Sequence, residues 1–198
     1  MNDKCLGILL AGGLARRMGG GDKCRQLLKN KSLLELSIER AQSQVSALIL
    51  NANGDPGRFD DVSLPIVPDC IEGFAGPLAG VLTGMEWAET NQADCQWVMS
   101  FATDTPFFPL DIVERLMKAA IAEDSLIAVA ESEGRLQPVF ALWHRSLAPQ
   151  LRTALVDEGV RKIDRWMALH PMSTVSFDDE KSFFNINRPE DMEIAKRL

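Results

Sequence analysis

Residues 5–23 read Cys-Leu-Gly-Ile-Leu-Leu-Ala-Gly-Gly-Leu-Ala-Arg-Arg-Met-Gly-Gly-Gly-Asp-Lys. The apolar run 5–10 predicts a short buried strand, and a glycine-rich loop follows it directly. Glycine allows backbone N–H groups to turn toward a ligand without a Cβ clash, and such groups bind phosphate. Arg16, Arg17 and Lys23 add positive charge to the same segment. The alternative is a plain flexible surface loop, but the position after a strand and the three cations favour phosphate binding.

The rest of the chain alternates apolar runs with amphipathic stretches, which predicts a three-layer α/β/α domain. Its sheet is expected to be mostly parallel, with a short antiparallel addition joined by a turn over 132–135. Strands are expected at 5–10, 47–50, 64–67, 97–101, 126–130, 139–143 and 174–177. Helices are expected at 32–44, which starts with the capping box Ser32-Leu-Leu-Glu35, and at 77–90, 110–123, 146–157, 161–169 and 189–197.

Composition narrows the class of protein. A chain of 198 residues with 46% hydrophobic residues predicts one domain over 1–198 with a substantial core. The net charge of -7 argues against a general nucleic-acid binder, because such domains are usually basic. The chain contains no run of 18 apolar residues, so no membrane-spanning helix is expected. The start lacks a signal-peptide layout. We therefore expect a cytoplasmic protein, without a membrane partner and monomeric.

The four cysteines, Cys5, Cys24, Cys70 and Cys95, form no CxxC pair, and the chain has only two histidines. This makes a zinc site improbable and predicts free thiols in a reducing compartment. Cys24 and Cys70 each follow a candidate site residue, so a reactive role is a minor alternative to simple packing.

Polar residues follow the predicted strands at the edge where an open α/β sheet binds its ligands. Asp104 is a candidate Mg²⁺ ligand, since Mg²⁺ is held by one or two carboxylates plus phosphate oxygens; the alternative is a turn or helix cap. Asp69 could share the metal, hold ribose and base, or be another turn carboxylate. Asn51 could read a base edge with its amide, or belong to an ordinary Asn-Ala-Asn-Gly turn.

Gly76, Gly80 and Gly84 are spaced by four, so they share one face of the predicted helix 77–90. Each glycine in a helix interior costs about 1 kcal/mol relative to alanine. A close approach of the helix backbone to the sheet or to a ligand is expected to offset this cost.

The segment 10–23 lacks the Walker and GxGxxG patterns and resembles the nucleotidyltransferase signature LAGGxxxRMGGxDK. Within that superfamily the chain is most similar to the bacterial molybdenum cofactor guanylyltransferases, because of the pair Gly12-Gly13 and the acid Asp22. The resemblance implies a Rossmann-like fold of nucleotidyltransferase type. It implies transfer of GMP from GTP to the phosphate of molybdenum-molybdopterin, with residues 1–110 binding the nucleotide and 111–198 forming the molybdopterin side.

The same resemblance implies roles for particular residues. The catalytic set is Arg17, Lys23 and Asp104, with Asp104 as the Mg²⁺ ligand. GTP contacts are implied for Leu10, Ala11, Gly12, Gly13, Lys23, Asn51, Asp69, Gly76 and Asp104. Molybdopterin contacts are implied for Arg161, Lys162, Asn185 and Asn187, and molybdoenzyme apoproteins or their chaperones would be partners that receive the product.

Some positions depart from the family pattern. Arg188 stands where threonine is usual, Gln137 stands where histidine is frequent, and Cys24-Arg25-Gln26 replaces a small residue followed by leucine. Two other readings stay open. One is a cytidylyltransferase acting on molybdopterin, or a sugar-phosphate nucleotidyltransferase. The other is a non-catalytic nucleotide-binding or cofactor-carrier protein on the same fold.

Overall fold

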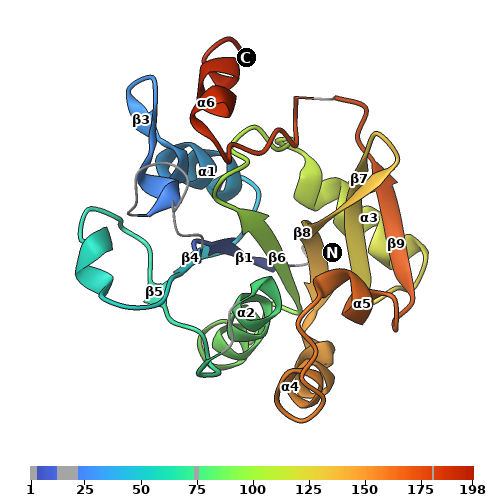
Figure 1. Cartoon of the computed structure of the whole chain (residues 1–198). Coiled ribbons are helices and arrows are strands. Elements are labelled where there is room, and N and C mark those ends of the chain that lie inside the picture. Colours follow the sequence, from blue (N-terminus) through green and yellow to red (C-terminus); the bar gives the residue numbers. More distant parts are fainter. Residues whose placement is uncertain (1–3, 13–21, 74–75, 180) are drawn as a thin grey trace.

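A seven-stranded mixed sheet forms the centre of the computed structural model, which describes residues 4–12, 22–73, 76–179 and 181–198 (Figure 1). Its strand order is β5-β4-β1-β6-β8-β7-β9. The strands are β1 (Cys5–Leu10), β4 (Ala47–Asn51), β5 (Ile66–Val67), β6 (Trp97–Ala102), β7 (Ile127–Ser132), β8 (Arg135–His144) and β9 (Met172–Ser176). β5, β4, β1 and β6 pair in parallel, as do β7 and β9, whereas β8 is antiparallel to both of its neighbours.

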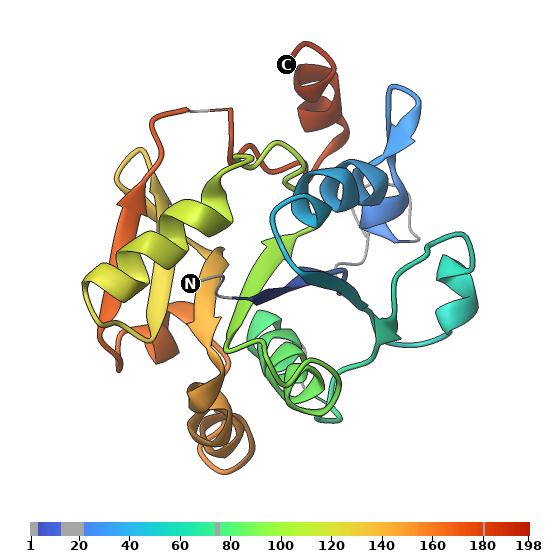
Figure 2. The same ribbon diagram turned by 180° about the vertical axis from the view of Figure 1, so that it is seen from behind.

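Helices cover both faces of this sheet (Figures 1 and 2). On one face α1 (Leu33–Gln42) and α3 (Ile112–Ala122) pack into one buried apolar cluster. On the other face α2 (Pro77–Asn91), α4 (Ala148–Val156) and α5 (Ile163–Met167) pack into a second cluster. α6 (Pro189–Ala195) packs beside the hairpin β2 (Leu27–Leu28) and β3 (Lys31–Ser32) in a third, smaller cluster. The chain is thus a three-layer α/β/α structure.

The predicted elements are confirmed with small shifts of their ends. The capping box at the start of α1 is present, because Ser32 accepts from the Glu35 N–H at 3.1 Å and Glu35 accepts from the Ser32 N–H at 2.6 Å. The turn that joins β7 to β8 is formed by Glu133 and Gly134, both with positive φ. The hairpin β2–β3 was not predicted, because two-residue strands carry no periodic signal.

The antiparallel strand β8 is larger than expected and lies inside the sheet rather than at its margin. Its pairing with β7 jumps from Val129–Ala141 to Ala130–Gln137, so residues 138–140 bulge out of the ladder. Its pairing with β6 ends at Ser100, whose hydroxyl donates to the carbonyl of Val139 at 2.6 Å. Bulges of this kind redirect side chains next to binding sites, and this one opens the sheet beside the end of β6.

Two glycines let α2 lie close to the sheet. A Cβ on Gly80 would lie 2.5 Å from Asn51 Oδ1 and 2.5 Å from Leu10 Cδ2, and a Cβ on Gly84 would lie 3.0 Å from Val98 Cγ1. The expected close approach of this glycine face to the sheet is therefore confirmed. At the start of α2, Gly76 is the residue before Pro77, which occupies the first helical position.

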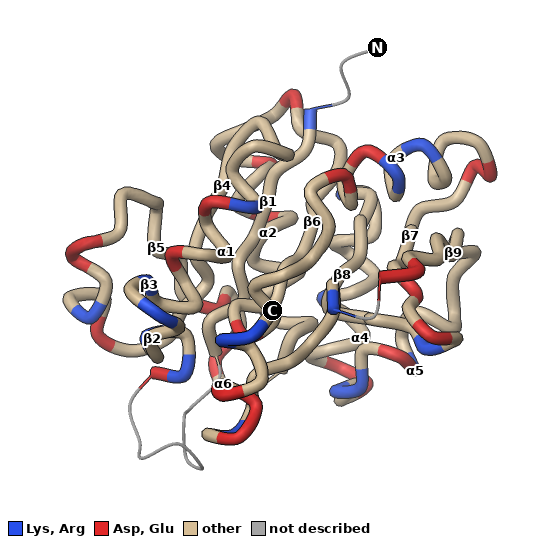
Figure 3. The backbone as a smooth tube through the Cα atoms, turned by 90° about the horizontal axis from the view of Figure 1, so that it is seen from above, with Lys and Arg blue, Asp and Glu red and all other residues tan. Residues whose placement is uncertain are grey.

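Basic and acidic residues are interspersed along the described chain, without one extended basic face in the part that Figure 3 colours. None of the helices in the described residues is long and apolar enough to cross a membrane.

Candidate nucleotide-binding site

A cavity of about 450 Å³ lies at the carboxyl ends of β1, β4, β5 and β6. Eight of the predicted site residues line it: Leu10, Gly12, Lys23, Asn51, Asp69, Gly76, Asp104 and Asn185. A further wall comes from the bulge in β8 (Gln137–Phe140) and from Phe183. The topology thus brings segments from both halves of the chain to one hollow, as expected for the edge at which parallel strands end.

Lys23 is the shared hydrogen-bond partner of several polar side chains at this cavity. It begins a short 3₁₀ helix (Lys23–Arg25) that follows the glycine-rich loop, and its side chain is only 11% exposed. Its ammonium donates to Asp104 Oδ2 at 2.5 Å, to the amide oxygen of Asn187, and more weakly to Asn185 Oδ1 at 3.4 Å. The end of β6 and the C-terminal segment therefore meet at the ammonium of Lys23.

The C-terminal segment reaches this point through a backbone contact, since the Ile186 N–H donates to the carbonyl of Asp104 at 2.8 Å. Asn185 and Asn187 lie on either side of Ile186, which is fully buried. In an extended segment, residues two apart project to the same side. The two asparagines, expected at the molybdopterin side, therefore contact Lys23, which the sequence assigned to the phosphates.

The oxygens around Lys23 fit a hard divalent cation. Asp104 supplies a carboxylate that is a quarter exposed, and Asn185 and Asn187 supply amide oxygens to the same ammonium. Oxygen donors of this kind suit Mg²⁺. The described residues contain no group of three or more His, Cys, Asp or Glu that could hold a metal alone, so a Mg²⁺ ion here would depend on phosphate oxygens for its other ligands.

Asp69 follows β5, which β4 and β1 separate from β6, and it is held by two asparagines. Asn51 Nδ2 donates to Asp69 Oδ1 at 2.9 Å and to the carbonyl of Val67 at 3.1 Å. Asn53 Nδ2 donates to Asp69 Oδ2 at 2.8 Å, and its Oδ1 accepts from the Asp69 N–H at 2.8 Å. Both amide hydrogens of Asn51 are thus engaged, one by the Val67 carbonyl and one by Asp69, while Asn51 still lines the cavity.

The residues that end β1 contribute unequally. Leu10 and Gly12 line the cavity, and a Cβ on Gly12 would meet nothing within 4 Å. Ala11 is buried, does not line the cavity, and donates its N–H to the carbonyl of Asn51 at 2.9 Å. Its backbone extends the sheet, so the expected GTP contact from Ala11 finds no free donor here. The predicted Gly13, Arg16 and Arg17 lie outside the described residues.

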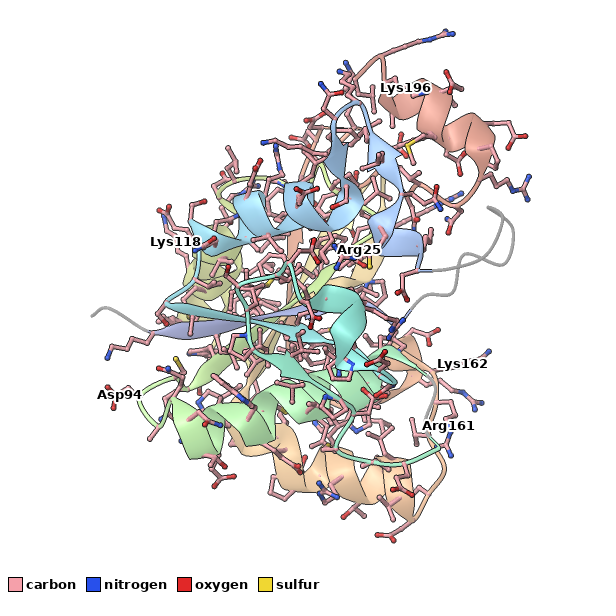
Figure 4. The ribbon with its side chains drawn as sticks, turned by 90° about the vertical axis from the view of Figure 1, so that its left-hand side faces the viewer. Arg25, Asp94, Lys118, Arg161, Lys162 and Lys196 are labelled. Atoms are coloured by element: carbon pink, nitrogen blue, oxygen red, sulfur yellow. The ribbon has the colours of Figure 1, made fainter. Side chains whose placement is uncertain are left out.

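Arg161 and Lys162 do not line the cavity. Figure 4 shows their side chains pointing away from the ribbon on the side of the molecule opposite to Asp94 and Lys118. Arg161 donates to the carbonyls of Leu155 and Val160, and its own carbonyl lies 3.8 Å from the position of a Cβ on Gly76. The backbone of Arg161 is therefore close to Gly76, whereas neither Arg161 nor Lys162 lines the cavity.

No cysteine or histidine is among the described residues that line this cavity. Burial, followed by the nearby Asp22 carboxylate, raises the pKa of the Cys24 thiol to about 11, and burial raises the pKa of Cys70 as well. A raised pKa leaves little thiolate, which is the reactive form. His144 and His170 are absent from the residues that line the cavity.

Several residues of the site were not predicted. Asn53 follows Asn51 by two positions, so both side chains project to one side of an extended segment, and this spacing could have indicated the pair that holds Asp69. Thr103 donates to the carbonyl of Leu10 at 3.1 Å and joins the ends of β6 and β1. Phe140 and Phe183 contact each other with ring centroids 5.2 Å apart. The neighbouring sequence does not indicate that these phenylalanines line a cavity. Phe140 reaches it because of the bulge in β8.

Comparisons with known proteins agree with this geometry. Residues 7–172 match the family described as the MobA-like NTP transferase domain. A molybdenum cofactor guanylyltransferase of Nitrobacter hamburgensis is 47% identical over 194 residues, covering 97% of this chain and 93% of that protein. One from Mesorhizobium japonicum is 48% identical over 197 residues, covering 97% and 94%.

Solved structures show the same fold. Molybdopterin-guanine dinucleotide biosynthesis protein A from Archaeoglobus fulgidus has a TM-score of 0.77 at 23% identity, covering 97% of each chain. A 4-diphosphocytidyl-2C-methyl-D-erythritol synthase from Anaerococcus prevotii has a TM-score of 0.74 at 12% identity, covering 98% of this chain and 95% of that one. The near-complete match to the curated relatives confirms the predicted resemblance: the chain belongs to the molybdenum cofactor guanylyltransferases, within the family of MobA-like NTP transferase domains.

Proposed function

We propose that this chain transfers GMP from GTP to the phosphate of molybdenum-molybdopterin, in the cavity formed by Lys23, Asp69 and Asp104. The products are the guanine dinucleotide form of the cofactor and pyrophosphate. The observation that carries the assignment of the site is the meeting of Lys23 and Asp104 at 2.5 Å in a cavity that Gly12 also lines. A cation and a metal-binding carboxylate at one point suit a triphosphate.

The reaction is an in-line displacement at the α-phosphorus of GTP. An oxygen of the molybdopterin phosphate forms a bond to that phosphorus, and the bond to the bridging oxygen of the leaving pyrophosphate breaks. The attacking phosphate is already ionised at neutral pH, so no general base is needed. Such transfers depend mainly on positioning and on neutralisation of charge, which agrees with the absence of histidine from the lining of the described cavity.

Lys23 and Arg17 neutralise the charge of the triphosphate in this proposal. Lys23 points its ammonium at Asp104, Asn185 and Asn187. A lysine has three donors on a flexible stem, so it can exchange one of these partners for a phosphate oxygen without leaving the others.

Asp104 holds Mg²⁺ in this proposal, with the amide oxygens of Asn185 and Asn187 as further donors on the same side of the cavity. When bound, the ion supplies charge neutralisation to the phosphate oxygens. The carboxylate is kept in place by the backbone contact to Ile186 and by the Thr105 hydroxyl, which donates to Asp104 Oδ1 at 3.2 Å.

Asp69 binds the nucleoside part of GTP. Its two oxygens each accept from one asparagine, and an ionised carboxylate offers about four acceptor positions. Capacity is left for the N1–H and N2–H₂ donors of guanine or for ribose hydroxyls. Adenine presents an acceptor at N1 where guanine presents a donor, so it would leave an acceptor of Asp69 without a partner.

The wall formed by Gln137–Phe140 and Phe183 faces the other substrate. It comes from the segment 111–198, whereas Lys23, Asp69 and Asp104 come from 1–110. This wall supports a molybdopterin side formed by 111–198, although Asn185 and Asn187 of the same segment contact Lys23 on the phosphate side. Arg161 and Lys162, which do not line the cavity, offer positive charge to the molybdopterin phosphate. In this proposal the protein is a monomer, and its product is passed to molybdoenzyme apoproteins or their chaperones.

The experiment that tests the phosphate assignment compares ligands with and without phosphates. Lys23→Ala should weaken binding of GTP by about 10- to 150-fold, since one charge-assisted contact contributes about 1.5–3 kcal/mol. Binding of guanosine should change little. Lys31→Ala is the control, because Lys31 pairs with Glu39 on the surface and does not line the cavity. Equal losses for GTP and guanosine in the Lys23 variant would place this lysine away from the phosphates.

A further inference from the structure

We propose that Arg58 is a positioning residue that ties the phosphate side of the cavity to its nucleoside side. Arg58 belongs to a short 3₁₀ helix (Pro56–Phe59) that does not line the cavity. Its guanidinium nevertheless contacts both of the loops that carry the site. The inference deepens the proposed function and rests on its assignment of Lys23 to phosphate and of Asp69 to the nucleoside.

The first contact is to the phosphate side. Arg58 Nη1 donates to the carboxylate of Asp22, the residue directly before Lys23. The Asp22 side chain is only 12% exposed, so water screens this pair less than an ordinary surface pair. The Arg25 N–H also bonds to the Asp22 carbonyl at 3.0 Å. Asp22 is therefore held at both its backbone and its side chain, where the chain turns into Lys23.

The second contact is to the nucleoside side. Arg58 Nη2 donates to the carbonyl of Asn53, and Arg58 Nε donates to the carbonyl of Asp55 at 3.0 Å. The side chain of Asn53 in turn makes both of its hydrogen bonds to Asp69. One planar guanidinium thus reaches Asp22 on one side and, through Asn53, Asp69 on the other. A lysine ammonium cannot reproduce this fork, because it is a single point charge.

A buried ring fixes the position of this guanidinium. Phe59 is fully buried in the core, and the guanidinium carbons of Arg58 and Arg25 lie 5.1 and 4.9 Å from its ring centroid. Arg25 also donates to the Arg58 carbonyl at 2.5 Å and forms two hydrogen bonds with Asp61, at 2.7 and 2.5 Å. Figure 4 shows Arg25 where the β2–β3 hairpin approaches this 3₁₀ helix.

The turn between the two contacts leaves little freedom. Gly54 has φ +88°, a conformation that side chains rarely adopt, and a Cβ there would lie 3.6 Å from Arg58 Nη2. Gly54 thus permits the turn that presents the carbonyls of Asn53 and Asp55 to the same guanidinium.

The test measures GTP affinity and thermal stability together for three arginine variants. Arg58→Gln should weaken GTP binding by about tenfold or more, the size of a lost charge-assisted contact. Arg58→Lys should keep the Tm near that of the wild type but should not restore GTP affinity, because it can satisfy only one of the two loops. Arg115→Gln is the matched control: Arg115 also stacks on a phenylalanine, Phe177, and donates to a carbonyl, that of Ser176. It should leave GTP affinity within about twofold.

A double substitution adds a readout that a purely structural role would not move. Asp22→Asn should also weaken GTP binding, though less than Arg58→Gln, because it affects only the contact on the phosphate side. The double variant should bind no worse than Arg58→Gln, since that variant already lacks the contact with Asp22. The inference is overturned if Arg58→Gln binds GTP like the wild type, if the two losses add, or if Arg58→Lys restores affinity along with Tm. If Lys23→Ala weakens GTP binding and Arg58→Gln does not, this inference fails alone. If neither does, the proposed function of the site fails too.

Discussion

The substitution Gly80→Ala tests how the packing of α2 supports the nucleotide site. The added Cβ would lie 2.5 Å from Asn51 Oδ1 and from Leu10 Cδ2, whereas ordinary contact begins at 3.4 Å. One side must move by about 0.9 Å, the difference between these two distances. Asn51 cannot turn aside freely, because its amide donates to Asp69 at 2.9 Å and to the Val67 carbonyl at 3.1 Å.

The expected loss of stability follows from opposing contributions. Overpacking costs about 1–3 kcal/mol, and a hydrogen bond of Asn51 that is lost costs about 0.5–1.5 kcal/mol. The better helix propensity of alanine offsets about 1 kcal/mol of this loss of stability. A net loss of about 2 kcal/mol would lower the Tm by about 4–8 °C in a chain of this size. Because Asp69 loses part of its support, GTP affinity should fall by about tenfold.

Gly84→Ala is the matched control on the same helix. Its Cβ would lie 3.0 Å from Val98 and 3.2 Å from Ile8, which are core side chains and not part of the site. A shift of a few tenths of an ångström suffices there, so the gain in helix propensity offsets most of the cost. Thermal melts and GTP titrations of both variants decide the question. Equal GTP affinity in the Gly80 and Gly84 variants would refute the link between Gly80, Asn51 and Asp69.

Three further outcomes are expected. Asp104→Asn should keep the fold, as judged by circular dichroism, and nearly abolish transfer, since an amide lacks the charge that holds Mg²⁺; turnover like that of the wild type at limiting Mg²⁺ would disprove the metal assignment. Asp69→Asn should reduce the preference for GTP over ATP in competition binding, because unpaired buried groups cost about 1–3 kcal/mol each; an unchanged preference would move base recognition elsewhere. Cys24 should be alkylated at pH 8 about a hundredfold more slowly in the native protein than in urea, because burial raises its pKa from 9.0 to about 11; similar rates in peptide mapping would contradict this.

The sequence predicted the part of the fold that depends on local patterns. Long apolar runs, the capping box at Ser32, and the glycine face of α2 each have a physical signature within a few residues, and each is found in the structure. The hairpin β2–β3 and the interior position of β8 depend on which strands pair across the chain. Periodicity along one segment carries no information about such pairing.

The candidate site divides in the same way. Lys23, Asp69 and Asp104 follow predicted strands or the glycine-rich loop, so their meeting at one sheet edge could be expected from chain order. The bulge at 138–140 and the contact of Asn187 with Lys23 could not, since both arise from long-range docking. The contacts of Asn51 with Val67 and Asp69 could not be expected either, because they depend on the pairing of β4 with β5.

The most direct test of guanylyl transfer in this cavity is the release of pyrophosphate. The enzyme is mixed with Mg²⁺ and molybdenum-molybdopterin, and GTP, CTP and ATP are compared at equal concentration. We expect release with GTP, dependence on the molybdopterin substrate, and a rate at least about a hundredfold lower with ATP, as two unpaired buried groups would impose. Equal release from the three nucleotides would contradict the account of base recognition, and release that does not require molybdopterin would contradict the proposed acceptor.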